Sequence, residues 1–332
     1  MSVPPMSQMM LRIASSVADR HATASTTPPS RPRPCQLQPG IEWRSVSAAT
    51  KPEHEPDPWA MDVVVLRDKH RPARRVDACE AAARAVVSLL DDPRCQPDGP
   101  WWQAVQHWEN TRIRKIVRRA DGKRWTDVQE VAGVTVTQPA PDDDHDAAAV
   151  RAIVPAPVGG QPRAVNKLQI SGTHLPDDGV SASSDAIVTI EINPMIEMTT
   201  GKACAQCGHA AQRAYRILQE SQTQESSQKT WDDDDEQRAQ GLHGHVVPAP
   251  QQRCDQVHGQ LQEGGEAEIL RCWRADRFRV RVVTPTVEQW QEHTRPVEII
   301  DAGFTEFDGP TATTRAYWHA MCAPESGVHS EG

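Results

Sequence analysis

The chain has 332 residues, 38% of them hydrophobic, and a formal net charge of −9 at pH 7. That length predicts one large domain or two ordinary ones. The negative charge argues against a protein whose whole surface coats nucleic acid, and it leaves room for a local basic patch.

The sequence contains no run of about 18 apolar residues, so no membrane-spanning helix is expected. Its N-terminus has no apolar segment of the kind found in secretion signals. Eight scattered cysteines are too few for a disulfide scaffold and fit a reducing compartment. We therefore expect a cytoplasmic protein with no membrane partner.

The first half of the chain predicts a small α/β domain behind a disordered tail. Residues 1–57 are rich in Ser, Thr, Pro and Arg, which is typical of disorder. The domain, residues 58–172, has these predicted elements in order: a strand over 59–67, a helix over 77–90 capped by Asp77, a strand over 131–138, a strand over 148–157 and a short helix within 161–170.

The most basic stretch of the chain lies between the helix 77–90 and the strand 131–138. It includes a basic strand and carries seven cations: Arg112, Arg114, Lys115, Arg118, Arg119, Lys123 and Arg124. Such a stretch is a candidate contact for phosphate groups.

A polar linker over 173–184 leads to a second α/β domain over 185–320, followed by a tail over 321–332. Its predicted elements are a strand over 185–194, a helix opened by Thr200, a low-complexity mobile insertion over 219–265, a basic strand over 277–285, a short helix over 286–293, a strand ending at Asp301 and a last strand over 313–320. Both halves thus share the order strand, Ala-rich helix, basic strand, short helix, strand, loop, strand. This shared order favours two tandem copies.

The helix that begins near residue 200 has two stripes at helical spacing. Ala203, Cys207, Ala210, Ala214 and Ile217 predict a buried face. Lys202, Gln206, His209, Arg213 and Arg216 form a polar face that starts at the helix N-terminus. Because free backbone N–H groups and the helix dipole favour anions there, the polar face suits a phosphate-bearing partner.

The same segment contains Cys204, Cys207 and His209, which raises the alternative of a zinc site in a zinc-stabilised adaptor protein. A structural zinc site needs a second ligand pair, and the sequence shows no other CxxC or HxxxH. Cys207 also lies on the apolar face, so a small buried hydrophobe is the favoured interpretation. No metal is predicted.

Two motifs resemble the type II peptidyl-tRNA hydrolases, the archaeal and eukaryotic kind. The segment 198–215, MTTGKACAQCGHAAQRAY, is similar to that family's first helix, with Met, Gly-Lys and Gln-x-x-His-Ala-Ala. The segment 298–314, EIIDAGFTEFDGPTATT, resembles its Asp-Ala-Gly-x-Thr stretch, followed by a loop and a further Thr. The resemblance covers about residues 185–320.

The resemblance implies a fold, a reaction and a set of site residues. The implied fold is a three-layer α/β/α domain with a four-stranded mixed sheet, present here as two tandem copies of which the first is degenerate. The implied reaction is hydrolysis of the ester between peptide and tRNA, with no metal or cofactor. It assigns catalytic roles to Lys202, Gln206 and Asp301. It assigns substrate binding to Thr305 and to Thr313 (or Thr314 if the loop is one residue longer). His209 and Arg213, on the polar face of the same helix, are further candidates for substrate binding.

Elementary chemistry agrees with the implied roles. A carboxylate at a strand end can orient a water molecule for attack on an ester, and a nearby lysine can offset the charge that develops on the carbonyl oxygen. An aspartate with a raised pKa would serve this purpose better.

The sequence also departs from the family. Met198-Thr-Thr-Gly-Lys202 has lost one basic residue of the family's motif, and a different segment, 315–332, replaces the family's closing strand and last helix. These losses favour an alternative: a catalytically weak or inactive relative that binds RNA or a protein partner. The basic stretch 112–124, with Arg118 and Arg119, would restore tRNA affinity if the first half packs on the second as an intramolecular pseudo-dimer. A homodimer is the other arrangement.

Overall fold

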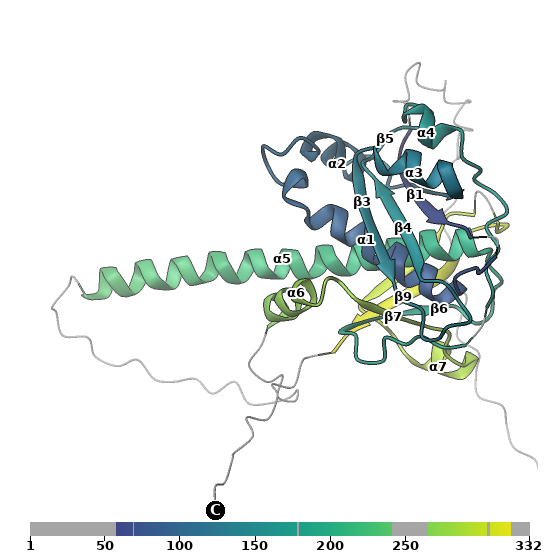
Figure 1. Ribbon diagram of the computed structural model, residues 1–332. Helices are drawn as coiled ribbons and strands as arrows, with labels where there is room; N and C mark the ends of the chain where they lie inside the picture. The colour runs from purple at the N-terminus through teal and green to yellow at the C-terminus, as the bar shows by residue number, and fades with distance from the viewer. Residues whose placement is uncertain (1–57, 69, 178, 241–264, 304–305, 320–332) are drawn as a thin grey trace, which may run out of the picture. The chain divides into compact units, whose positions relative to one another are not determined.

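The computed structural model describes residues 58–68, 70–177, 179–240, 265–303 and 306–319 (Figure 1). All of them belong to one compact unit that begins at Glu55. The predicted tails, 1–57 and 321–332, lie outside the described residues.

The first half forms a mixed sheet with the strand order β2-β1-β4-β3. β1 pairs parallel with β2 and antiparallel with β4, and β3 pairs antiparallel with β4. The short strand β5 adds to β1. The elements are β1 Trp59–Leu66, α1 Arg75–Asp91, a 3-10 turn Pro93–Cys95, α2 Trp102–Glu109, β2 Lys115–Ala120, α3 Gly122–Gln129, β3 Gly133–Gln138, β4 Ala148–Ile153, β5 Ala156–Pro157 and α4 Arg163–Asn166.

The second half repeats this topology with the strand order β7-β6-β9-β8. β6 pairs parallel with β7 and antiparallel with β9, and β8 pairs antiparallel with β9. The elements are β6 Val188–Ile192, α5 Thr200–Gln240, α6 Glu266–Ala275, β7 Val280–Val283, α7 Val287–Glu292, β8 Val297–Asp301 and β9 Thr311–Trp318. The predicted α/β class and the tandem arrangement are therefore confirmed.

Helices cover both faces of the first sheet, because the strands carry apolar residues on both faces. In β1, Met61, Val63 and Val65 belong to the core that includes α1, whereas Val64 packs in a second cluster with Val128 of α3 and the α4 region. This alternation is the period-two pattern of a strand buried on both sides. The half is thus a three-layer α/β/α domain, as predicted.

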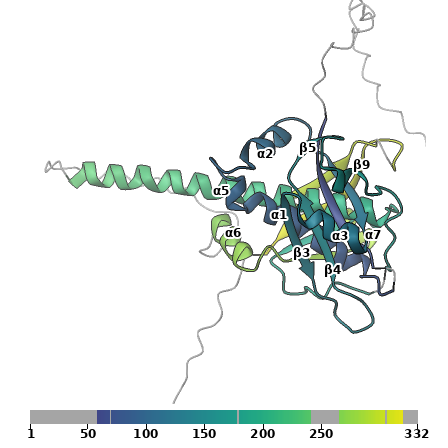
Figure 2. The ribbon, with the colours of Figure 1, turned by 45° about the horizontal axis from the view of Figure 1, so that its top comes forward.

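The two halves meet through α1 and α5, which run side by side in the same direction. Near their N-termini, the Cys79 and Cys204 sulfur atoms lie 3.9 Å apart. Further along, the Tyr215 hydroxyl donates to Asp91 at 3.0 Å. Small residues line both helices at this contact, which allows close packing. Figure 1 shows α5 continuing well past this contact, and Figure 2 shows the same from a second direction.

Three predictions from the sequence need correction. Asp77 does not cap α1: Arg74 is the N-cap residue, and the Asp77 carboxylate lies in the first turn, where it accepts two hydrogen bonds from the Arg74 guanidinium. The predicted insertion 219–265 is helical as far as Gln240, because residues 219–240 contain no Gly or Pro and many good helix formers. Residues 241–264 lie outside the described chain. Two helices that precede the basic strands, α2 and α6, were not predicted.

α2 and α6 each carry a tryptophan in the same setting. Trp108 and Trp273 are both fully buried. The Trp108 indole nitrogen donates to the Arg114 carbonyl at 3.0 Å, and the Trp273 indole nitrogen donates to the Arg279 carbonyl at 2.8 Å. Both tryptophans open the pattern Trp-x-x-x-Arg-x-Arg just before β2 and β7. This shared pattern is a sequence repeat between the two halves that was not predicted.

Ion pairs between the halves occupy matching positions with exchanged charges. Arg216 of α5 pairs with Glu109 at the end of α2, with a shortest distance of 2.6 Å. In the reciprocal place, Arg274 of α6 pairs with Asp91 at the end of α1, at 2.7 Å. Such reciprocal contacts are those expected between two subunits related by a two-fold axis.

Candidate active site

The first turn of α5 is fixed by a cap from the residue before it. The Thr199 hydroxyl accepts a hydrogen bond from the Lys202 backbone N–H at 3.2 Å and donates to a Glu306 oxygen at 2.7 Å. A second Glu306 oxygen accepts from the Thr199 backbone N–H at 3.2 Å. A threonine cap of this kind satisfies an orphan N–H of the first turn. It sets the direction in which Lys202 leaves the helix.

Lys202, Gln206 and Asp301 lie together, as predicted. One Asp301 carboxylate oxygen accepts from the Lys202 ammonium at 2.6 Å and from the Gln206 amide nitrogen at 2.8 Å. The other oxygen accepts from the Gly303 backbone N–H at 2.9 Å. The exposed fractions of the Lys202 and Asp301 side chains are 11% and 15%, so the pair is shielded but reachable from solvent.

The pKa of Asp301 is lowered from its ordinary value. Burial acts to raise it, but the hydrogen bonds from Lys202, Gly303 and Gln206 together with the lysine charge outweigh that effect. The raised pKa that would make Asp301 a better base is therefore not present in this arrangement. Asp301 is an ionised hydrogen-bond acceptor at neutral pH.

A β-bulge explains why the sequence could not decide between Thr313 and Thr314. The β8–β9 register shifts between Ile299 and Ile300, which leaves Thr313 as an extra residue in β9. Both threonines are fully buried. The Thr313 hydroxyl lies 2.9 Å from the Gln206 side-chain oxygen and 3.2 Å from the Ile299 carbonyl, and the Thr314 hydroxyl donates to the Gln206 backbone carbonyl at 3.2 Å. Both threonines thus hold Gln206.

Gly303 completes the turn that follows Asp301. Its φ of 82° is in the left-handed region, and a Cβ placed there would lie 2.7 Å from the Gly309 backbone. A side chain therefore cannot fit without moving the turn. The Asp-Ala-Gly motif thus combines a carboxylate with the turn that supplies one of its three donors.

His209 and Arg213, the two other predicted substrate-binding residues that the structure describes, lie further along α5 than this cluster. Thr305 falls outside the described residues. Arg213 is exposed on α5, two turns beyond Gln206. The His209 ring nitrogen Nδ1 lies 3.1 Å from the ammonium of Lys115, which belongs to β2 of the first half.

Lys115, which the sequence placed in the basic stretch as a candidate phosphate contact, is a neighbour of the site. Its ammonium donates to the Gln212 side chain, and it lies 5.1 Å from the centre of the Trp108 ring. Burial lowers the pKa of Lys115 to about 7, against a smaller opposing effect of Glu109. The pKa of His209 is lowered well below its usual range by burial and by the charges of Lys115 and Lys202. His209 is therefore a neutral imidazole at neutral pH.

The cysteines of the zinc alternative face the contact with α1. Cys79, Cys204 and Cys207 are fully buried, and Cys204 and Cys207 have pKa values raised by Cys79 and by burial. In the part of the chain that the structure describes, no group of three or more His, Cys, Asp or Glu side chains could hold a metal ion.

The predicted role of Arg118 in RNA binding is wrong. Its guanidinium donates to the buried Asp62 carboxylate at 2.5 Å and to the Leu168 carbonyl at 3.2 Å, and the residue is 6% exposed. Because β2 alternates its side chains, Arg118 points into the layer under α4. Arg119, the next residue, points to the opposite face and keeps partial exposure.

One of the comparisons with known proteins covers the helix part of this cluster. Residues 187–243 match the sequence model of the family described as Peptidyl-tRNA hydrolase PTH2, and Lys202 and Gln206 lie within the match. No curated protein and no solved structure matches the chain. Among the described helices, none is long and apolar enough to cross a membrane. The family match supports a relation of the second half to the peptidyl-tRNA hydrolases.

Proposed function

We propose that the protein hydrolyses the ester bond of peptidyl-tRNA, releasing peptide and free tRNA, and that the second half carries the catalysis. The observation that carries this proposal is the cluster of Lys202, Gln206 and Asp301, placed at the start of the helix that matches the hydrolase family. A carboxylate, a cation and an amide meet there at a site that solvent reaches.

The cluster supports a direct attack by water. The ionised Asp301 orients a water molecule through a hydrogen bond, and the water oxygen adds to the ester carbonyl carbon. Lys202 stabilises the negative charge that grows on the carbonyl oxygen. The bond to the ribose oxygen then breaks, the water's proton passes to that oxygen, and the products are the peptide's carboxyl group and the tRNA's hydroxyl.

Gln206 and Thr313 have a positioning role in this proposal. The Gln206 side-chain oxygen accepts a hydrogen bond from the Thr313 hydroxyl, and this orients the amide so that its nitrogen is directed at Asp301. Substrate contact is assigned to Thr305 by resemblance and to His209 and Arg213 by their place on the polar face of α5, and these roles stay predictions.

Release of free tRNA from an N-blocked aminoacyl-tRNA tests the proposal. We expect turnover by the wild type and losses of about 100-fold or more in Lys202→Ala and Asp301→Asn, the scale for removing a charge-stabilising donor or the group that orients water. Arg271→Ala is the matched control, because Arg271 lies on α6 and is 72% exposed. Wild-type protein that binds tRNA without turnover would instead support the alternative, an inactive relative that binds RNA.

The first half does not offer a second catalytic cluster at matching positions. Asp77 of α1 stands where Lys202 stands in α5, because each directly precedes an Ala-Cys pair, Ala78-Cys79 or Ala203-Cys204. Ala81 lies four residues after Asp77 and so stands where Gln206 stands in α5. Gln138 ends β3 where Asp301 ends β8. These replacements support the proposal that the first half is a diverged, non-catalytic copy.

A further inference from the structure

The first half has a pocket lined by three arginines at the carboxyl ends of its parallel strands. Its volume is about 150 Å³, and it is lined by Arg67, Arg119, Ala120, Asp121, Arg124 and Gln169. Arg67 follows β1, Arg119 lies near the end of β2, and Arg124 lies in the first turn of α3. The crevice beyond the carboxyl ends of parallel strands, where a helix begins, is where α/β proteins bind anions.

The charge of the pocket is unbalanced. Three guanidiniums face one carboxylate, that of Asp121, which leaves a net charge of 3 − 1 = +2. Arg119 is held in place by hydrogen bonds to the Gln169 side chain at 3.0 Å and to the Gly172 carbonyl. Neither Arg67 nor Arg124 has an ion pair with any residue that the structure describes. Their donors can reach a ligand.

The backbone of α3 adds to this preference. The N-cap residue, Asp121, makes no side-chain cap hydrogen bond, and Gly122, at φ 45°, leaves open space where a side chain would stand. An oxyanion can therefore approach the first turn of α3 closely.

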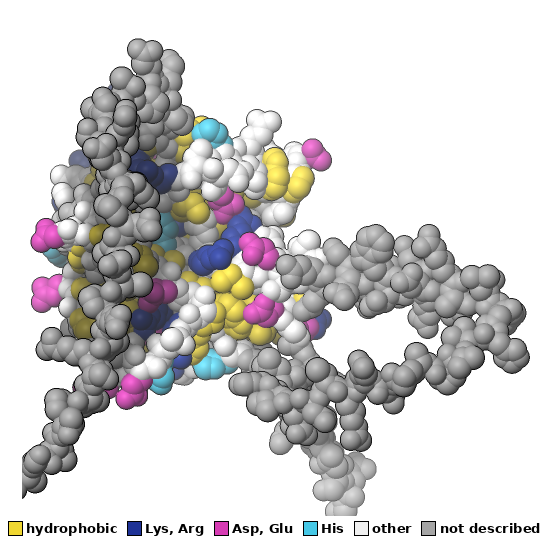
Figure 3. All heavy atoms as spheres, turned by 180° about the vertical axis from the view of Figure 1, so that it is seen from behind, with side chains coloured by type: hydrophobic (Ala, Val, Ile, Leu, Met, Phe, Trp, Pro, Cys, Tyr) yellow, Lys and Arg dark blue, Asp and Glu magenta, His cyan; other side chains and the backbone are white. Residues whose placement is uncertain are grey.

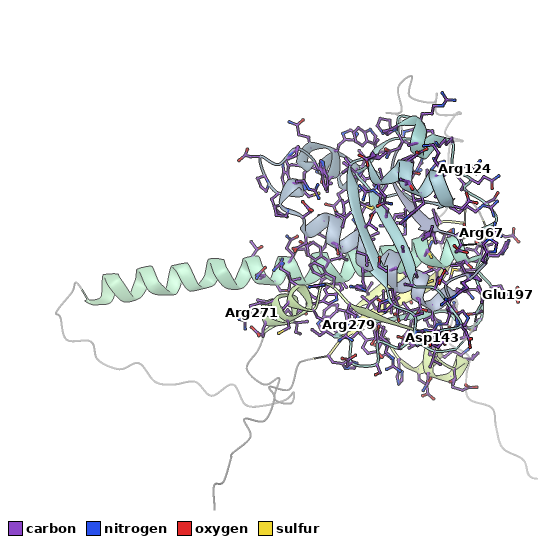
Figure 4. All side chains as sticks on the ribbon, viewed as in Figure 1. Arg67, Arg124, Asp143, Glu197, Arg271 and Arg279 are labelled. Atoms are coloured by element: carbon purple, nitrogen blue, oxygen red, sulfur yellow. The ribbon has the colours of Figure 1, made fainter. Side chains whose placement is uncertain are left out.

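The pocket lies at the same end of the molecule as the catalytic cluster. α1 and α5 run in the same direction, so the starts of both helices are at one end. A Cβ on Gly201, next to Lys202, would lie 3.8 Å from Val117, and Arg119 follows two residues later on the same face of β2. Figure 4 shows Arg67 and Arg124 along the same edge of the molecule as Glu197, which precedes α5.

We propose that the pocket formed by Arg67, Arg119 and Arg124 binds a backbone phosphate of the RNA substrate. This inference rests on the proposed function, since the first half would bind the same tRNA molecule whose ester the second half hydrolyses. Guanidinium groups suit the task because they pair with phosphate in a bidentate geometry. Figure 3 shows Lys and Arg side chains mixed with Asp and Glu side chains over the part of the rear surface that grey atoms leave visible.

The test compares Arg67→Glu/Arg124→Glu with Arg271→Glu, a control with a charge reversal on α6. Binding of labelled tRNA is measured from 50 to about 300 mM salt, and hydrolysis is measured in parallel. The pocket variant should bind at least about 10-fold more weakly at 100 mM salt, and its salt slope should fall by about 1 for each phosphate that it no longer neutralises. The control should match the wild type. Thermal unfolding of each variant shows that the fold is intact, and Arg67→Lys/Arg124→Lys should recover part of the affinity.

The outcomes separate this inference from the proposed function. Wild-type turnover with unchanged binding in the pocket variant overturns the inference and leaves the function standing. Binding that depends on the pocket, without wild-type turnover, supports the inference and removes the hydrolase. A wild type that does not bind tRNA overturns both. If inorganic phosphate at about 1 mM binds the wild type but not the pocket variant, while both proteins bind tRNA equally well, the pocket's ligand is a free phosphate, and the RNA assignment is wrong.

Discussion

The Lys115 ammonium occupies a place that disfavours its charge. It lies between Trp108 and α5, and its pKa falls to about 7 from an ordinary 10.5 because it is buried. Between those two pH values the unfolded chain binds more protons than the folded one, so wild-type stability should rise as pH increases from 7 towards 10. Below pH 7 both states carry the proton, and the full cost of the buried charge remains.

Lys115→Met tests this reasoning by chemical unfolding at pH 7 and pH 9.5. The variant should be more stable than the wild type at pH 7 by about 1–3 kcal/mol, the range for replacing a buried ionised group by an apolar one, and the difference should shrink at pH 9.5. Lys123→Met is the control, because the Lys123 side chain is 88% exposed. If the free energies of unfolding of Lys115→Met and the wild type differ by the same amount at both pH values, Lys115 does not carry a buried charge.

Asp301 leads to a prediction about the pH dependence of catalysis. Its pKa is lowered from the ordinary value of a carboxyl group, and His209 is neutral at neutral pH because its pKa is lowered well below its usual range. We expect kcat/KM to show no acid limb in the ordinary range of a histidine and to fall only at lower pH, where Asp301 gains a proton. A pH–rate profile with an acid limb near pH 6 that persists in Lys115→Met would show that Asp301 is not the group that orients water.

At the residue scale, candidate residues can be selected from the sequence where a motif fixes both a residue and its neighbours. Lys202, Gln206 and Asp301 could be selected because the helix register and the Asp-Ala-Gly turn are local in sequence; the structure brings them together, and their catalytic role stays a prediction. The choice between Thr313 and Thr314 could not be made, since a β-bulge directs both towards Gln206 and a bulge has no local sequence signal. The contact of Lys115 with His209 could not be predicted either, because the two residues lie 94 positions apart in the sequence and belong to different halves.

At the scale of elements, α1 and α5 pack so closely that stability depends on the absence of a side chain at Gly208. A Cβ on Gly208 would lie 3.2 Å from a Val86 methyl group and 3.3 Å from the Lys115 side chain. Gly201, on the same helix, would make only ordinary contacts at 3.8 Å. Because alanine is the better helix former, Gly201→Ala should be neutral or stabilising by a few tenths of a kcal/mol, whereas overpacking should make Gly208→Ala less stable by about 1 kcal/mol.

A double-mutant cycle checks that this penalty arises at the contact between halves. Val86→Ala alone removes buried methyl groups and should cost about 1–2 kcal/mol. Combined with Gly208→Ala, it makes room for the new methyl group, so the double variant should be more stable than the sum of the single effects predicts. Additive effects in urea unfolding would show that α1 and α5 do not pack as described.

Element prediction failed where a segment's role depends on partners. Residues 219–240 looked like a mobile insertion because they are polar, yet helix propensity without Gly or Pro lets α5 continue through them. α2 and α6 escaped notice because each is short, and each is held by a tryptophan that bonds to the backbone six residues further on. By contrast, β1, β6 and β8 were predicted well, since a run rich in β-branched residues identifies a strand.

At the scale of the molecule, the two halves share buried polar contacts that neither could satisfy alone. Glu80 of α1 is fully buried, and burial raises its pKa. One of its oxygens accepts from the Ser181 hydroxyl and from the Val282 backbone N–H at 3.1 Å, and the other accepts from the Ser183 hydroxyl at 3.1 Å. The predicted linker 173–184 thus packs on α1, while the domain boundaries themselves stay a prediction.

These contacts predict that the second half does not behave as an independent domain. Expressed alone, residues 185–332 would expose the apolar face of α5, with Ala203, Cys207 and Ala210, and should aggregate or self-associate rather than form a stable monomer. Expressed together with residues 1–184 as a separate chain, they should form a 1:1 complex that regains hydrolysis, because α1 covers that face again. Size-exclusion chromatography with light scattering measures the stoichiometry, and hydrogen exchange reports protection in α5. A monomeric 185–332 fragment with a cooperative thermal transition would show that the second half folds alone, and the prediction would be wrong.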